Sequence, residues 1–233
     1  MTEPTAPPTI DLARTIRPQR YGASPTKAIV DPLVEPLWAG IRVIGAADED
    51  GAALFESGEE LHEEPIANAL RTMTRSTADA VIVDGYLTKQ AHPNGPLGAR
   101  LDLDPSTGEL LTQTFIGLRS KSRQDKERLR EAEAAARLFR PEDVITFLVT
   151  DLLWLDGTWL LDIPLLERRR LLEAVLPGDE LVRPGPYVRP PLHSWIGSWR
   201  SQGFTGLTFK EANSRYRPGE IASDWATTPM PMR

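Results

Sequence analysis

Cysteine, long apolar runs and a secretion signal are all missing from this sequence of 233 residues. Without cysteine, disulfide bonds, thiolate metal sites and thiol nucleophiles are excluded. No apolar run approaches the about 20 residues that a membrane-spanning helix needs. The N-terminus is rich in Pro and Thr and lacks the basic and then apolar order of a secretion signal. These absences lead us to expect a cytoplasmic protein that does not enter a membrane.

A surplus of basic residues is also missing. The chain has 27 Lys and Arg against 33 Asp and Glu, a net charge of −6, and a pI near 5.2. Because cations that neutralise phosphates supply most of the affinity of a nucleic-acid-binding protein, strong independent DNA binding is not expected. A local basic ridge at 119–140 is the exception. It is interpreted either as the solvated face of an exposed helix or as a surface for DNA or a partner protein.

The length allows one large domain or two small ones with a real core, and 40% hydrophobic and 26% charged residues are ordinary for a globular protein. The pattern divides the chain into three parts. Residues 1–26, with five prolines, are interpreted as an extended or poorly ordered arm. Residues 27–226 form the domain, and residues 227–233 an irregular tail.

Hydrophobic periodicity predicts strands interleaved with helices, which indicates an α/β or α+β fold. An apolar run at 27–30 is interpreted as the strand that enters the core, and the acidic stretch 56–64 as a solvated loop. The other predicted elements are a hairpin at 41–47 and 52–55, a helix at 65–75, strands beginning at 81 and at 145, a long loop at 91–108, helices at 164–175 and 193–202, and a last strand at 206–210.

Three motif blocks stand in a fixed order along the domain. The first, Glu35 to Arg42, reads Glu-Pro-Leu-Trp-Ala-Gly-Ile-Arg. The second joins Asp-Leu-Leu-Trp-Leu-Asp-Gly at 151–157 to Pro-Leu-Leu-Glu-Arg-Arg at 164–169. The third joins Thr-Gly-Leu-Thr-Phe-Lys at 205–210 to Ser-Arg-Tyr-Arg-Pro-Gly at 214–219.

In this order and at these spacings, the blocks resemble the adenylation domain of ATP-dependent DNA ligases over residues 27–226. The resemblance implies an α+β, ATP-grasp-like nucleotidyltransferase domain with mixed or antiparallel sheets flanked by helices. The chain ends at Arg233, so the C-terminal OB domain with which ligases close around DNA is not expected. DNA repair and recombination are implied by the family alone.

The nucleophile of that family is replaced. Its first motif is Glu-Pro-Lys-Trp-Asp-Gly-x-Arg, in which the lysine takes AMP from ATP. This chemistry requires an amine with a pKa well below the ~10.4 of free lysine and magnesium to spread the negative charge. Leu37 stands at the lysine and has no lone pair, and Ala39 stands at the aspartate. We therefore expect that this chain cannot adenylate itself by the family route.

Other positions with chemical roles are replaced as well. Tyr86 stands where the family has the glutamate of Asp-Gly-Glu, and Thr205 where it has the glutamate of Glu-Gly-x-x-x-Lys. The main functional matches that remain are Glu35, Arg42 and Lys210, which the resemblance makes candidate nucleotide contacts. No catalytic residue and no metal ligand is assigned: ATP would bind weakly, and the replaced carboxylates argue against Mg²⁺.

Three hypotheses follow. The first is a catalytically silent ligase relative that binds a nucleotide or a partner protein. The second is an active ligase or nucleotidyltransferase with another nucleophile, for which Lys210 is the main candidate. The third is an interaction protein without ligand binding. The oligomeric state is left open.

Overall fold

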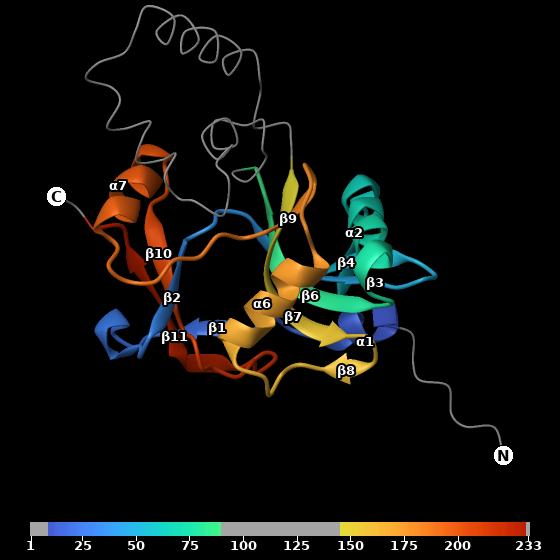
Figure 1. Cartoon of the computed structure of the whole chain (residues 1–233), viewed down its shortest axis with the longest axis horizontal. Helices are drawn as coiled ribbons and strands as arrows, with labels where there is room; N and C mark the ends of the chain where they lie inside the picture. Colours follow the sequence, from blue (N-terminus) through green and yellow to red (C-terminus); the bar gives the residue numbers. More distant parts are fainter. Residues whose placement is uncertain (1–8, 90–144, 232–233) are drawn as a thin grey trace, which may run out of the picture.

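The computed structural model describes residues 9–89 and 145–231, which form an α+β domain with two β-sheets and helices packed around them (Figure 1). The predicted loop at 91–108 and the ridge at 119–140 lie outside the described residues. The seven-stranded sheet has the order β5-β4-β3-β6-β7-β8, with β9 paired to β7, and the four-stranded sheet has the order β1-β11-β10-β2. The strands of the larger sheet are β3 (Ile41–Ala47), β4 (Ala52–Glu56), β5 (Glu59–Leu61), β6 (Val81–Thr88), β7 (Thr146–Leu155), β8 (Thr158–Trp159) and β9 (Val182–Pro184).

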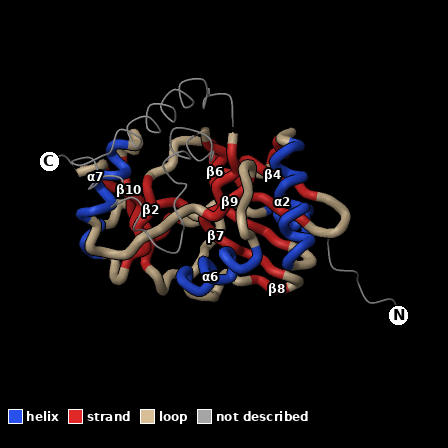
Figure 2. The backbone as a smooth tube through the Cα atoms, turned by 45° about the horizontal axis from the view of Figure 1, so that its top comes forward, coloured by secondary structure: helices blue, strands red, loops and turns tan. Residues whose placement is uncertain are grey.

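The central strand β6 shows why the larger sheet is buried on both faces. Its side chains alternate in direction, as in any strand. Val81, Val83 and Leu87 join the core beneath α2 (Glu64–Thr77) and α6 (Leu165–Val175). Figure 2 shows these two helices lying along the larger sheet. The residues between them, Ile82, Asp84 and Tyr86, face the smaller sheet instead, and all are buried.

The smaller sheet is built around β10 (Gly206–Glu211), which runs antiparallel to β11 (Ile221–Pro229) and to β2 (Pro32–Pro36). The edge strand β1 (Arg20–Gly22) pairs in parallel with β11. On the side of this sheet away from the larger one, Leu207 packs with Trp199 of α7 (His193–Ser201). The side facing the larger sheet carries Thr208 and Lys210, so alternation along β10 sends these polar side chains between the two sheets.

Most of the predicted elements are confirmed: the hairpin of β3 and β4, the three helices α2, α6 and α7, and the strands β6, β7 and β10. The fold class that the resemblance implies, α+β with mixed and antiparallel sheets flanked by helices, is also confirmed.

The prediction of an arm over residues 1–26 is wrong for its described part. Residues Thr9–Thr15 form α1, and β1 follows it. The apolar residues Ile10, Ala13 and Ile16 recur every three positions and pack against β3 and β4. The prolines concealed this helical spacing, and the N-terminal segment is part of the core.

Three local expectations were also wrong. The run at 27–30 is not a strand: Thr26–Ala28 is a 3-10 helix, η1, and the strand begins at Pro32. The acidic stretch contains β5, which returns from β4 through Ser57 and Gly58, both with positive φ as a tight hairpin turn requires. β10 is not the last strand, since β11 follows it and continues through 227–229, which were expected to be an irregular tail.

Candidate functional site: a buried charge cluster between the sheets

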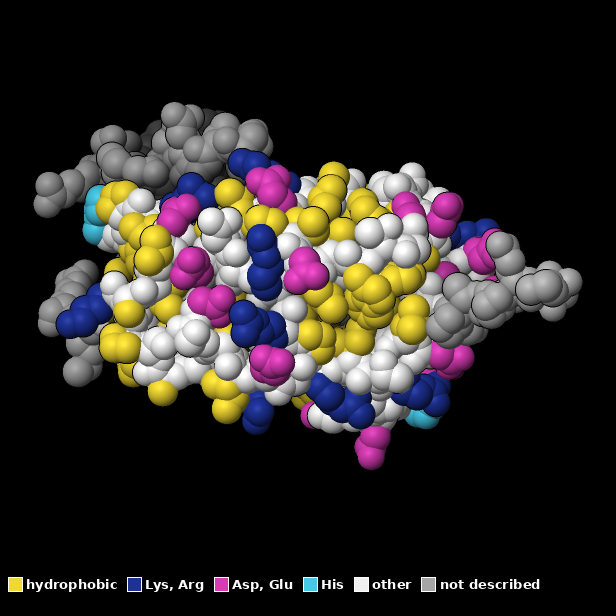
Figure 3. All heavy atoms as spheres, turned by 90° about the horizontal axis from the view of Figure 1, so that it is seen from below, with side chains coloured by type: hydrophobic (Ala, Val, Ile, Leu, Met, Phe, Trp, Pro, Cys, Tyr) yellow, Lys and Arg dark blue, Asp and Glu magenta, His cyan; other side chains and the backbone are white. Residues whose placement is uncertain are grey.

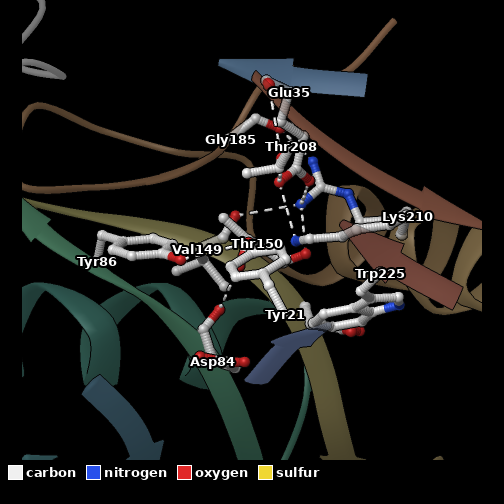
Figure 4. A network of polar contacts seen from close by, with 12 residues as sticks. Tyr21, Glu35, Asp84, Tyr86, Val149, Thr150, Gly185, Thr208, Lys210 and Trp225 are labelled. Carbon is white, nitrogen blue, oxygen red and sulfur yellow. Dashed lines mark hydrogen bonds and ion pairs between the residues drawn. The ribbon is translucent and has the colours of Figure 1, made fainter. Parts of the chain in front are cut away.

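Strand register brings Glu35 and Lys210 together between the two sheets (Figure 4). Thr208 lies directly opposite Glu35 on β2, and Lys210 follows two residues along the same face of β10. Lys210 Nζ lies 2.9 Å from Glu35 Oε2, and the two side chains are 0% and 2% exposed. The hydroxyl of Thr208 donates to the same carboxylate oxygen at 3.4 Å. Two of the three candidate nucleotide contacts are therefore each other's counter-ions.

A second cation, Arg169, reaches the same carboxylate from α6. Its Nη1 lies 3.8 Å from Glu35 Oε1, and its side chain is 0% exposed. The same guanidinium donates to the backbone oxygens of Thr150, at 2.7 Å, and of Gly185. One carboxylate thus faces two buried cations.

Trp225 closes the other side of Lys210. It lies directly opposite Lys210 on β11, and the ammonium is 4.7 Å from the centre of the indole ring, within cation–π range. Within the described part of the chain, neither Lys210 Nζ nor Arg169 Nε has a hydrogen-bond acceptor. The 2.9 Å contact with Glu35 is therefore an ion pair without hydrogen-bond alignment.

The third candidate nucleotide contact, Arg42, is held by the larger sheet. Its Nε and Nη2 donate to the two oxygens of Asp84 at 3.0 and 2.5 Å, a bidentate pair whose carboxylate is 0% exposed. The hydroxyl of Tyr216 donates to Asp84 at 2.8 Å, and the backbone oxygen of Gln19 accepts from Arg42 Nη1. Burial acts to lower the pKa of Arg42, but the carboxylate of Asp84 together with Tyr86 and Tyr21 raises that pKa above its ordinary value.

Aromatic rings surround the guanidinium of Arg42. The ring centres of Tyr21, Tyr86 and Trp225 lie 5.6, 5.7 and 5.9 Å from it. The hydroxyls of Tyr21 and Tyr86 are 3.3 Å apart. Burial raises the pKa of Tyr21 to about 12 and that of Tyr86 well above its ordinary value. Both phenols therefore stay protonated at neutral pH and are poor nucleophiles there.

Of the replaced motif positions, Tyr86 lies in this cluster beside Arg42, whereas Leu37, Ala39 and Thr205 lie outside it. Leu37 is half-buried and packs over Gly206, where a Cβ would lie 2.9 Å from Leu37 Cδ2. Ala39 and Thr205 are exposed. The residue at the family's nucleophile position is thus an aliphatic side chain packed on the backbone of β10. Leu37, Ala39 and Thr205 do not supply the groups that a lysine-bound AMP requires.

Arg169, Gln19 and Tyr21 are among the cluster residues that were not predicted as site residues. A signal for Arg169 was present, because Leu165 and Leu172 are seven positions apart and positions 168 and 169 lie between them on the same helical face. Gln19 and Tyr21 were missed because the N-terminal segment was interpreted as an arm.

The surface elsewhere is mixed in character. Figure 3 shows one face on which acidic and basic side chains are interspersed with hydrophobic ones. A hollow of about 190 Å³ lies near the start of α6 and the end of β10, lined by Asp31, Glu167, Glu211, Asn213 and apolar neighbours. In residues 9–89 and 145–231, no group of three or more acidic or His side chains is placed to hold a metal ion, and no helix is long and apolar enough to cross a membrane.

The sequence matches the family described as the ATP dependent DNA ligase domain over residues 103–227, more than half of the chain. The protein therefore belongs to the ATP-dependent DNA ligase family. Its fold is that of the ligase nucleotidyltransferase domain.

Relatives from mycobacteria show the same likeness. Over 83 residues the chain is 35% identical to the multifunctional non-homologous end joining protein LigD of Mycolicibacterium smegmatis, covering 35% of this chain and 10% of that protein. The ligase domain of M. tuberculosis LigD superposes with a TM-score of 0.58 at 20% identity, over 93% of this chain and 60% of that one. A mycobacterial DNA ligase D complexed with ATP and MES gives 0.57 at 20% identity, over 92% of this chain and 60% of that one. The chain thus spans less than two thirds of the length of each of these relatives.

Proposed function

We propose that this chain is a catalytically silent member of the DNA ligase family that does not form a lysine–AMP intermediate and acts by binding a partner. The observation that carries the proposal is the state of the two positions on which adenylation would depend. Leu37 replaces the nucleophile, and Lys210, the main alternative, is fully buried against Glu35.

Lys210 is a poor substitute nucleophile for a physical reason. Attack on the α-phosphate of ATP needs a neutral amine in line with the phosphorus atom. The nitrogen of Lys210 lies 2.9 Å from a carboxylate oxygen of Glu35 and 4.7 Å from the centre of the Trp225 ring, so these two groups already occupy positions that an in-line phosphate would need. Its side chain is 0% exposed, so ATP could reach the nitrogen only if the cluster opened.

Nucleotide contact through Glu35, Arg42 and Lys210 stays a prediction, and any such contact would be weak. All three side chains already have partners within the chain, so a phosphate would have to displace a carboxylate. Magnesium would need oxygen ligands, which Ala39 and Thr205 do not supply in place of the family's carboxylates. One mycobacterial relative is named for non-homologous end joining, which supports a partner from a DNA end-joining complex, and we propose that DNA contact is weak or indirect.

The test is the intact mass of the purified protein after incubation with ATP and magnesium. We expect an unchanged mass, while an active ATP-dependent ligase treated in parallel gains one AMP. The variant Lys210→Met is the matched control. An AMP adduct that survives denaturation in the natural chain and is absent from Lys210→Met would establish the active-enzyme hypothesis instead.

A further inference from the structure

We infer that Glu35 is a built-in occupant of an oxyanion site: its carboxylate stands between Lys210 and Arg169 where an anionic ligand would otherwise bind, and so closes the site to phosphates. The inference goes beyond catalytic silence, because it says what fills the site and which single side chain keeps it filled.

The charges around Glu35 are unequal. Two cations, Lys210 and Arg169, face one carboxylate at 2.9 and 3.8 Å, and all three side chains are at most 2% exposed. A buried cation without a counter-charge is strongly unfavourable. The cluster therefore has a residual demand for negative charge that Glu35 meets only in part.

The unsatisfied hydrogen-bond donors also indicate an oxyanion site. Lys210 Nζ and Arg169 Nε are buried and have no acceptor among the described residues, although buried donors are nearly always satisfied. Glu35 offers two oxygens, of which Oε2 already faces both Lys210 and Thr208. A tetrahedral oxyanion such as a phosphate group has more acceptor oxygens than a carboxylate, which matches this surplus of donors.

The neighbouring groups do not change the charge balance at Glu35. Arg42 and Asp84 neutralise each other in a bidentate pair, so they leave the balance at Glu35 unchanged. Thr208, Trp225 and the backbone oxygens of Thr150 and Gly185 carry no formal charge. Glu35 is accordingly the acidic side chain paired with Lys210 and Arg169 in the described structure.

The experiment compares the thermal stability of the natural chain and of Glu35→Gln as inorganic pyrophosphate is added at constant ionic strength. Glutamine has nearly the same shape but no charge, so the two cations lose their counter-ion. We expect Glu35→Gln to melt at a lower temperature than the natural chain, and its melting temperature to rise saturably with pyrophosphate, because a ligand that binds only the folded state stabilises it. The natural chain should show no such rise.

Two controls separate this effect from general charge removal. Glu60→Gln removes the acid of an exposed ion pair, Arg14–Glu60 at 3.2 Å, and should behave like the natural chain. Glu35→Gln combined with Lys210→Met removes one of the two cations and should lose most of the response to pyrophosphate.

The inference is overturned by a rise in the natural chain equal to that in the variant, or by a folded Glu35→Gln that does not respond. If Glu35→Gln is recovered unfolded, refolding is repeated with pyrophosphate present. Return of the native tryptophan fluorescence then supports an oxyanion site, and failure to return contradicts it. None of these outcomes depends on AMP transfer, so they are distinguishable from failure of the proposed function.

Discussion

The pair Asp151–Arg168 offers the sharpest test of how this fold is held together. Asp151 lies on β7 and Arg168 on α6, and both side chains are 0% exposed. Arg168 donates to both carboxylate oxygens at 2.8 Å. The same guanidinium also donates to the backbone oxygens of Ile163 and Ser214. One side chain thus joins the larger sheet to the segments before α6 and after β10.

The perturbation is Asp151→Asn. Asparagine keeps the shape but removes the counter-charge, and its amide presents N–H groups to a guanidinium that can only donate. Breaking a buried pair by removing one partner costs about 3–5 kcal/mol. This is a large part of the roughly 5–15 kcal/mol by which a domain is stable. With a urea m-value of about 2–3 kcal/mol/M, the midpoint should fall by roughly 1–2.5 M.

The matched control lies on the same helix. Glu167→Gln removes the acid of the pair Arg170–Glu167, which is as close, at 2.6 Å, but 62% and 48% exposed. Exposed pairs contribute about 0–1 kcal/mol. Urea unfolding followed by fluorescence gives both values. If Asp151→Asn costs no more than Glu167→Gln at an unchanged m-value, the claim that this buried pair holds β7 and α6 together is refuted.

Three further predictions follow from other contacts. Gly85→Ala should strongly destabilise the fold, because the new Cβ would lie 2.2 Å from the backbone oxygen of Leu148, and a large drop in urea midpoint checks it. Burial raises the pKa of all four tyrosines, that of Tyr21 to about 12. Absorbance at 295 nm should therefore show little phenolate in the folded chain at pH 10, where about half of unfolded tyrosines are ionised. Because the pKa values are raised in the folded state, the protonated tyrosines should contribute fully to the free energy of unfolding below pH 10, and this contribution should fall as the pH rises from 10 towards 12. Tyrosines that titrate near pH 10 in the folded chain would contradict this. Leu37→Lys should remain unlabelled after incubation with ATP and magnesium, since Ala39 and Thr205 still lack carboxylates; an AMP adduct would show that the rest of the site is competent.

The sequence predicted the α+β class and most elements because their hydrophobic patterns were complete within single segments. β6 and β7 are apolar runs of strand length, and α2 shows Ile66, Leu70 and Met73 at helical spacing. The N-terminal segment failed because prolines dominated its composition, while its apolar residues pack against a sheet formed later in the chain.

The candidate site was predictable only in part. The motif matches identified Glu35, Arg42 and Lys210, but not that their charges are matched inside the chain. The partner of Arg42, Asp84, lies 42 positions away, and that of Lys210 lies 175 positions away across a strand pairing. Such pairings depend on register, which a single sequence does not specify for distant strands.

The measurement that tests the account most directly is a calorimetric titration of ATP, with and without magnesium, into the natural chain and into Lys210→Met. Because every candidate phosphate contact already has a partner in the chain, we expect no saturable binding below about 1 mM, which corresponds to about −4 kcal/mol, in either protein. Micromolar binding by the natural chain that disappears in Lys210→Met would contradict the account, because it would mean that Glu35 yields its cation to a nucleotide.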